Sequence, residues 1–203
     1  MDFNDTAEEN NFRLEVREWL EKNAPKDKKI GGYDSIDVEE SALERAREWQ
    51  AKKADAGYAA ITWPKEYGGL GASSIHSVIY SQEEAKYNVP SGIYDIGLGM
   101  CIPTMMAWAT KEQNERYVEP ALYGKEIWCQ LFSEPSAGSD VAGVRTKAEK
   151  DGDDWLINGQ KVWTSGAHFC DFGIIVVRTD PKAPKHKGLS FFFLDMKSPG
   201  IDI

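Results

Sequence analysis

The chain has 203 residues, 41% of them hydrophobic and 11% aromatic, which is ordinary for a protein with one substantial core or two small ones. Its 24 Lys and Arg residues against 33 Asp and Glu residues give a formal net charge of −9, without the basic stripe that nucleic acid or an anionic membrane favours. No apolar stretch approaches the roughly 20 residues that span a bilayer, and Met1 to Asp5 lack the basic start of a signal peptide. We therefore expect a cytoplasmic protein with no membrane span and no nucleic-acid partner.

The N-terminal sequence has the pattern of amphipathic helices. Thr6 to Glu9 have the spacing of a capping box, and apolar residues then recur at helical intervals until Pro25. Asp37 and Glu40 predict the start of a second helix, and Gly57 predicts its end. Two helices are thus expected before the glycine-rich loop around residues 63–72.

Further helices are predicted after that loop. Ser73 or Ser74 would cap a third helix with a buried apolar stripe. The stripe comprises Ile75, Val78 and Ile79. Residues 91–109 are apolar and helical in pattern, with Pro103 either kinking the helix or restarting it.

A capping box at Thr110–Gln113 opens a short helix that Pro120 is expected to close. Residues 1–125 are therefore expected to form an all-helical domain.

The pattern changes to short β-strands after Gly124. Apolar runs with β-branched and aromatic residues occur at 127–132, 174–177 and 189–194. Asn158–Gly159 is a two-residue hairpin signal, and Asp180 to Lys187 has the length of a hairpin loop. Ile201 to Ile203 resemble the start of another strand. The expected fold class is α+β, with an all-α domain followed by a β-sheet or β-barrel domain at 126–203 that is incomplete at its C-terminus.

Two loops are the candidate ligand site. Residues 130–140 form a small-residue-rich loop in which Pro135 fixes one φ angle and Gly138 permits close approach, so that backbone N–H groups can face an anion or a planar ring. Residues 161–167 supply an indole from Trp163 and two hydroxyls that can reach the polar edge of a ring. The two loops are expected to form two halves of one site.

The sequences of these loops resemble the acyl-CoA dehydrogenase family. The resemblance rests on Phe132–Asp140 (FSEPSAGSD) followed by Asn158–Ser165 (NGQKVWTS), and Trp63–Gly69 (WPKEYGG) is similar to a loop at the same place in the family. Ser136 departs from the glycine more usual at its position. By this resemblance Ile203 falls within the middle domain, so the family's C-terminal helical domain and its catalytic glutamate are absent. No catalytic residue is therefore expected in this chain.

The resemblance implies FAD as cofactor and assigns residues to it. Trp163 would lie against the flavin ring, Ser165 would bond near N5, and Ser139 would also lie close to the acyl-CoA. The implied FAD-binding residues are Gln130, Phe132, Ser133, Ser139, Trp163, Thr164 and Ser165. The region that resembles the acyl-pocket helix has a stripe at helical spacing, and its two glycines would leave room for long or bulky acyl groups. The implied substrate-binding residues of this stripe are Gly92, Asp95, Ile96 and Gly99.

Simpler interpretations stay open for several of these residues. Trp163 could be a core tryptophan of a sheet, and the serines could bond their own backbone in turns. The glycines of the stripe could serve close helix packing. Glu134, a carboxylate before a proline, is expected to hold its loop by accepting N–H bonds rather than to act as a general base.

The resemblance implies FAD-dependent α,β-dehydrogenation of an acyl-CoA thioester, as in fatty-acid β-oxidation. A glutamate removes the α-proton, the β-hydride passes to the flavin, and electrons go to an electron-transfer flavoprotein. The complete enzyme would be a homotetramer, and this chain alone would be inactive. Two alternatives stay open: a non-catalytic short subunit that binds FAD or acyl-CoA in a hetero-oligomer, and an acyl-CoA oxidase-type flavoenzyme.

Other site classes have no support in the sequence. The three histidines share no ligand spacing, so no metal is implied. The odd set of three cysteines is expected to be buried thiols in a reducing compartment rather than disulfides. No glycine motif completes the dinucleotide-binding fingerprint after a strand.

Overall fold

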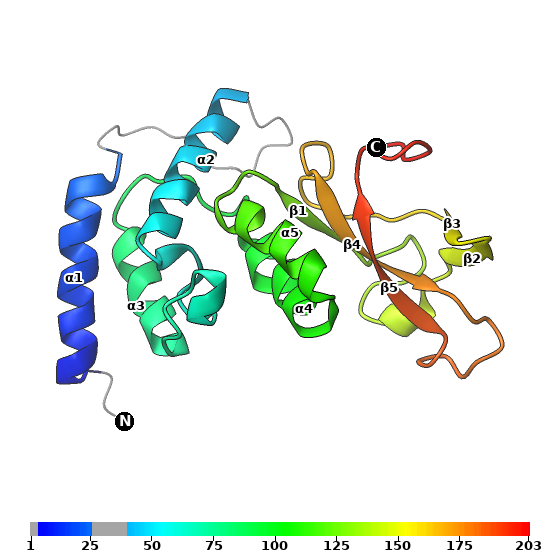
Figure 1. Cartoon of the computed structure of the whole chain (residues 1–203), viewed down its shortest axis with the longest axis horizontal. Helices are drawn as coiled ribbons and strands as arrows, with labels where there is room; N and C mark the ends of the chain where they lie inside the picture. The colour runs from blue at the N-terminus through cyan, green and yellow to red at the C-terminus, as the bar shows by residue number, and fades with distance from the viewer. Residues whose placement is uncertain (1–3, 26–39) are drawn as a thin grey trace.

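The fold was determined from a computed structural model that describes residues 4–25 and 40–203. The predicted cap at Asp37 lies outside these residues. Helices lie at one end of the molecule and a sheet at the other, with α4 and α5 between the remaining helices and the sheet (Figure 1). The helices are α1 (Ala7–Asn23), α2 (Glu40–Asp55), α3 (Ser74–Glu84), α4 (Ile102–Trp108) and α5 (Lys111–Leu122).

Both predicted capping boxes are present. The Thr6 hydroxyl accepts from the Glu9 N–H at 3.2 Å, and the Glu9 carboxylate accepts from the Thr6 N–H at 2.6 Å. Thr110 and Gln113 make the same reciprocal pair at 3.3 and 2.9 Å. Each box satisfies two N–H groups that a helix start otherwise leaves without partners, and so each fixes the first residue of its helix.

The buried face of α3 differs from the predicted one. Ile79 is buried, but Ile75 and Val78 are 43% and 47% exposed. Tyr80 and Glu83 are buried instead, because these two residues face α1 and α2. The predicted stripe was therefore wrong at two of its three positions, because polar partners on α1 decide which side of α3 turns inward.

The two prolines expected to interrupt helices are accommodated. A π-helical turn, Gly97–Cys101, precedes α4, and the Ile102 N–H bonds to the Gly97 carbonyl across this wide turn. Pro103 then lies in the first turn of α4, where its missing N–H costs little. Pro120 does not close α5, which continues to Leu122, because a proline in the last turn removes only one helical hydrogen bond.

A mixed, open sheet follows the helices, and the fold is therefore α+β as expected. Within the described residues its strand order is β1-β4-β2-β3, and β5 pairs with β4. β1 runs parallel to β4, and β5 runs antiparallel to β4. The strands are β1 (Trp128–Leu131), β2 (Lys147–Asp151), β3 (Asp154–Asn158), β4 (Phe172–Arg178) and β5 (Leu189–Asp195).

The turns of the sheet match the sequence in part. Residues 179–188 join β4 to β5 as a hairpin loop, which agrees with the prediction for Asp180 to Lys187. The predicted hairpin at Asn158–Gly159 is wrong, because β2 and β3 pair around Asp151–Asp154. At Gly159 a Cβ would approach Thr146 Cα to 2.6 Å, so this glycine serves close backbone approach. Residues 201–203 form no strand.

The two faces of the sheet belong to different cores. Ile174 of β4 packs with residues of α4 and α5, including Ile102 and Val118. On the other face Ile175 and Val177 pack with buried groups that include two cysteines and residues of β2. β1 is at one end of the strand order, on the side of the sheet near the helices (Figure 1). The first candidate loop begins at the C-terminal end of this strand, between the helices and the rest of the sheet.

Candidate functional site

The first candidate loop leaves β1 and folds into a tight turn. Glu134 and Ala137 pair through both backbone bonds, at 2.7 and 3.1 Å, so that Pro135 and Ser136 lie at the tip. Proline suits this position because its φ is fixed and its missing N–H is not needed. Ser139, beyond the turn, is exposed. The turn therefore presents a short exposed edge that is anchored on each side by a buried residue.

The Glu134 carboxylate anchors this turn from beneath. It accepts from the Arg145 N–H at 2.6 Å, the Thr146 N–H at 2.9 Å and the Lys161 ammonium at 2.8 Å. Burial raises the pKa of Glu134, but the hydrogen bonds from Lys161 and Thr146 outweigh it and hold the pKa at about 2. Glu134 thus stays ionised and organises the loop, which agrees with the interpretation of this residue as a loop anchor.

Lys161 joins the second loop to the first. Its ammonium donates to the Phe132 carbonyl at 3.1 Å and the Val176 carbonyl at 2.6 Å as well as to Glu134, so all three donors are used. The side chains of Lys161 and Glu134 are only 6% and 4% exposed. Burial lowers the pKa of Lys161, and contact with the Glu134 carboxylate opposes that change. The role of Lys161 could not be read from the sequence, because its partners Phe132, Glu134 and Val176 are far from it in the chain.

Trp163 is not a core residue. Its side chain is 91% exposed, and its φ of 60° is the only positive value of a non-glycine residue among the described residues. A bulky residue in the left-handed region costs about 1–2 kcal/mol. The alternative of a core tryptophan in a sheet does not hold, because the backbone holds the indole in solvent despite this strain.

The hydroxyl beside this indole has an unusual environment. Thr164 Oγ1 is buried and lacks a hydrogen-bond partner among the described residues. Leaving a buried hydroxyl without a partner costs about 1–3 kcal/mol. Together with the strained, exposed Trp163 it makes residues 163–165 a candidate segment for ligand contact.

The structure brings the two loops together. The Val162 N–H donates to the Ser133 carbonyl at 2.9 Å, next to the Lys161–Phe132 bond. Phe132 is half-buried and meets Phe191 of β5 edge-to-face, with ring centroids 5.5 Å apart. Gln130 lies half-buried on β1, and Ser165 is exposed. The predicted FAD-binding residues therefore lie on the end of β1 and on two loops that contact each other directly.

The predicted acyl-pocket residues lie elsewhere, around a cavity of about 320 Å³ within the helical part. Gly92, Asp95 and Gly99 line this cavity, but Ile96 does not. Ile96 packs instead against the core shared by α4, α5 and the sheet. The four residues of the predicted stripe thus do not share one face. Gly92 lies before the helical turns that begin at Asp95, and its φ is 87°.

Among the residues that the structure describes, no group of three or more His, Cys, Asp or Glu side chains could hold a metal ion. No helix in residues 4–25 and 40–203 is both long enough and apolar enough to cross a membrane. All three cysteines are buried as free thiols.

Comparison with known proteins agrees with the loop motifs. A sequence model of the N-terminal domain of acyl-CoA dehydrogenases matches residues 6–125, and one of the middle domain matches residues 129–203. Acyl-CoA dehydrogenase IpdE1 of Mycobacterium tuberculosis (strain ATCC 25618 / H37Rv) is 39% identical over 193 residues, which cover 95% of this chain and 50% of IpdE1.

Solved structures match over nearly the whole chain. A protein described as the Tcur3481-Tcur3483 steroid ACAD matches with a TM-score of 0.81 and 32% identity, over 98% of this chain and 50% of that one. The ChsE4-ChsE5 complex from Mycobacterium tuberculosis matches with a TM-score of 0.75 and 30% identity, over 97% and 49%. This chain spans about half the length of these relatives. It belongs to the acyl-CoA dehydrogenase family, with sequence that matches the N-terminal and middle domains.

Proposed function

We propose that this chain forms the flavin-binding and acyl-binding part of an FAD-dependent acyl-CoA dehydrogenase. The family is a family of flavoenzyme oxidoreductases, and the two domain models cover residues 6–125 and 129–203. The catalytic base would come from outside this chain, and electrons would pass to an electron-transfer flavoprotein. The observation that carries the proposal is the exposed, strained Trp163 beside the buried, unpartnered Thr164 hydroxyl.

The residues of the two loops fit a flavin. A planar ring over Trp163 would cover an indole that is otherwise 91% exposed, and a polar ring edge would give Thr164 Oγ1 its missing partner. Gln130, Phe132, Ser133, Ser139 and Ser165 would complete the contacts. When bound, FAD supplies the acceptor for the electron pair that no protein side chain can take.

The chain's own residues would orient the reactants. Lys161 and Glu134 fix the spacing between the loops, which would set the position of Trp163 and Ser165 against the ring. Phe132 and Phe191 would keep water from one side of the site. Exclusion of water strengthens every hydrogen bond made there.

The acyl group is proposed to extend towards Gly92, Asp95 and Gly99. A Cβ built at either glycine meets no atom within 4 Å, so both glycines border open space. A Gly99→Leu substitution should therefore reduce the binding of long acyl groups in the complete enzyme, and full retained activity on long chains would contradict this role.

A hetero-oligomeric subunit is a second candidate, and one observation favours it. Two of the matching structures are named as pairs of proteins, Tcur3481-Tcur3483 and ChsE4-ChsE5. A partner chain in such a complex could supply the catalytic base. Mixing this chain with candidate partner subunits and measuring the mass of the complex by light scattering would separate this candidate from a homotetramer.

The flavin proposal is tested by titrating FAD with the chain and following flavin fluorescence. Trp163→Asn removes the indole and keeps a residue that tolerates positive φ, so the variant should fold at least as stably while its affinity for FAD falls at least tenfold. Trp108→Asn is the matched control, because Trp108 is 85% exposed at the end of α4. Equal FAD affinity in the two variants would contradict the proposal.

A further inference from the structure

The cavity in the helical part has a polar wall that the acyl-pocket proposal does not explain. It is bordered by α2, α3, the segment 58–63 and residues 90–99. One wall is a single stripe of α3 with positions at i, i+3, i+4 and i+7. The residues of this stripe are Ser77, Tyr80, Ser81 and Glu84. An ordinary hydrocarbon pocket would carry apolar residues at such positions.

Glu84 is the centre of this wall. Its Oε1 accepts from Trp49 Nε1 at 3.0 Å and from the Tyr80 hydroxyl at 3.0 Å, and Lys53 Nζ lies 3.6 Å from the same oxygen. Burial, followed by contact with Glu84, raises the pKa of Tyr80, so its hydroxyl stays a donor to the carboxylate. These contacts fix the carboxylate and converge on one of its two oxygens.

Lys53 is held less tightly than its partners. Its only ion pair in the described part of the chain is the 3.6 Å contact with Glu84, which is longer than a direct hydrogen bond. The side chains of Lys53 and Glu84 are each 17% exposed. Lys53 lines the cavity, and its ammonium therefore has donor capacity left for another group there.

Two glycines of the lining leave space for an occupant. Gly92 and Gly99 border the cavity without a side chain, and nothing lies within 4 Å of a Cβ at either position. Asp95, between them in the sequence, lines the same cavity. The cavity of about 320 Å³ thus combines open space at the two glycines with the hydrogen-bonding groups of α2 and α3.

The charges of the lining decide which polar group fits. Lys53 contributes one positive charge, and Glu84 and Asp95 contribute one negative charge each, so the lining has a net negative charge. A carboxylate would gain from Lys53 but would be repelled by two carboxylates. A hydrocarbon end would offer no hydrogen bond to Lys53, whose contact with Glu84 is 3.6 Å long, or to the second Glu84 oxygen, which is unfavourable. A neutral group that accepts a hydrogen bond from Lys53 avoids the repulsion, and a hydroxyl can also donate to Glu84.

We propose that this cavity binds the end of the acyl group far from the thioester and selects acyl groups with a neutral hydrogen-bonding substituent, a hydroxyl or a ketone. The inference rests on the proposed acyl-CoA binding. A hydroxyl there donates to the second Glu84 carboxylate oxygen and accepts from Lys53, and a ketone accepts from Lys53 alone. Lys53 and Glu84 are then specificity-determining residues, remote from the chemistry at the loops.

The test uses three CoA esters of equal chain length with the chain, measured by isothermal titration calorimetry. The probes are octanoyl-CoA, 8-hydroxyoctanoyl-CoA and octanedioyl-CoA. One added hydrogen bond to charged groups should make 8-hydroxyoctanoyl-CoA bind about fivefold tighter than octanoyl-CoA or more. Octanedioyl-CoA should bind no more tightly than octanoyl-CoA, since its free carboxylate meets Glu84 and Asp95.

Lys53→Met tests the role of the lysine and preserves the length of its side chain. The preference for the hydroxyl should disappear, and the affinity for octanoyl-CoA should stay or rise. Lys52→Met is the matched control, because Lys52 is an exposed neighbour on the same helix. Gly99→Leu is a second variant that should weaken all three esters and leave the binding of free CoA unchanged.

The outcomes distinguish failure of the proposed acyl-CoA binding from failure of the proposed selection of a polar acyl end. Failure of all three esters to bind the unmodified chain would overturn the proposed acyl-CoA binding, and the inference with it. Equal binding of octanoyl and 8-hydroxyoctanoyl esters, with no effect of Lys53→Met, would overturn the inference and leave acyl-CoA binding intact. Binding that Gly99→Leu does not change would also overturn it, because the acyl end would then lie outside the cavity.

Discussion

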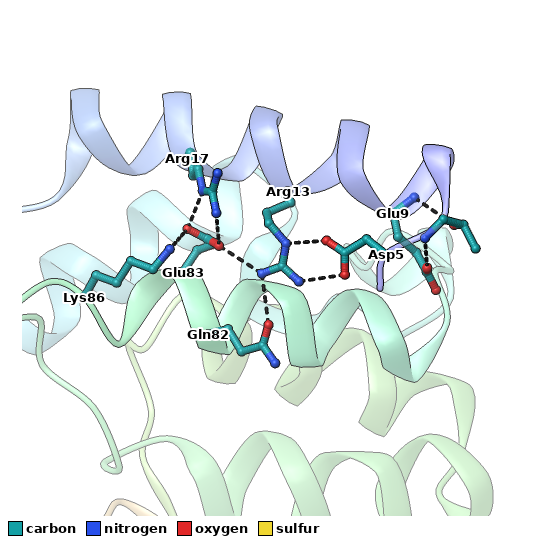
Figure 2. A network of polar contacts seen from close by, with 8 residues as sticks. Asp5, Glu9, Arg13, Arg17, Gln82, Glu83 and Lys86 are labelled. Atoms are coloured by element: carbon teal, nitrogen blue, oxygen red, sulfur yellow. Dashed lines mark hydrogen bonds and ion pairs between the residues drawn. The ribbon is translucent and has the colours of Figure 1, made fainter. Parts of the chain in front are cut away.

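Glu83 in the helical part and Glu134 in the sheet part are both almost fully buried carboxylates that tie distant segments together, but they are neutralised in different ways. Glu83 is 1% exposed and receives three cationic side chains, from Arg13 and Arg17 of α1 and from Lys86 (Figure 2). Glu134 is matched by one lysine and by backbone N–H groups. The two carboxylates therefore differ in the number of cations that neutralise them, three for Glu83 and one for Glu134.

Two of the three cations around Glu83 lie at the surface. Arg17 and Lys86 are 45% and 54% exposed, and Arg13 is also bound to Asp5 and Gln82 (Figure 2). Hydrogen bonds from Arg17 lower the pKa of Glu83 to about 2, with Lys86 and Arg13 adding to the effect while burial opposes it. Because the charge is shared, loss of one cation leaves the carboxylate neutralised by the others.

Glu134 has no second cationic partner among the described residues. Lys161 is its single cationic partner, buried to the same degree, and the same ammonium holds Phe132 and Val176. The shared network docks α1 on α3, whereas the single pair positions the two candidate ligand loops. The difference indicates that the scaffold tolerates surface substitutions and that the site depends on one buried ion pair.

The largest predicted effect comes from acid, which removes both anchors together. Both carboxyls have a folded pKa of about 2, below their ordinary value of 4.5. Such groups stabilise the fold fully above the unfolded pKa, and the stabilisation is lost as pH falls from about 4.5 through about 2. Roughly 3 kcal/mol should be lost for each group. Urea unfolding at pH 6, 4, 3 and 2 measures this, and a flat profile would contradict both networks.

Lys161→Met should have the next largest effect. It leaves a buried carboxylate without a cation and cuts the link between the loops, which should cost about 3–5 kcal/mol of unfolding free energy and most FAD affinity. Glu134→Gln combined with Lys161→Met should recover part of that stability, because no charge is then buried alone. Unfolding of the Lys161→Met variant at the same urea concentration as the unmodified chain would contradict the conclusion that Glu134 depends on this one cation.

Glu83→Gln should cost less, about 2 kcal/mol, because the remaining cations can turn to water or, for Arg13, to Asp5. It should loosen α1 from α3, which hydrogen exchange of residues 7–23 would detect, and it should remove one of the two acid transitions. FAD affinity should stay the same. A matching loss of FAD binding would show that the two networks are coupled.

Lys86→Met should have the smallest effect on the free energy of unfolding, below about 1 kcal/mol. Lys86 is exposed and is only one of three cations that neutralise Glu83, so its own contribution is small. It is the direct counterpart of Lys161→Met, with the same substitution beside a buried glutamate. Thermal unfolding of the two variants side by side compares them. Equal destabilisation would remove the distinction between the shared and the single cation.

Local signals in the sequence predicted the ends of elements well. The Thr6 and Thr110 capping boxes join residues three apart in the chain, so no tertiary contact is needed to form them. The apolar runs at β1, β4 and β5 were also found, and β4 in particular is buried on both faces and therefore apolar throughout its interior. The inward side of α3 was not, since Ile75 and Val78 satisfy helical spacing equally well when exposed.

The candidate site was predictable in part. The loop motifs identified the residue types, and the role of Glu134 as an anchor followed from its place before Pro135. Trp163 kept two interpretations until its φ of 60° and its exposure were known. The division of Gly92, Asp95, Ile96 and Gly99 between a cavity and a core was not predictable, because Gly92 lies before the helical turns with φ of 87° and the helical spacing counted from it does not apply.

The sequence by itself determined the family, the order of a helical part before a sheet, and the positions of the caps and loops. These depend on residue identity and on spacings of a few residues. The tertiary structure alone decided that Lys161 bonds Glu134, that Arg13 and Arg17 bond Glu83, and that Lys53, Glu84 and Gly99 line one cavity. Such contacts join residues far apart in the chain, and their free energy depends on burial, which only the folded packing of the segments creates.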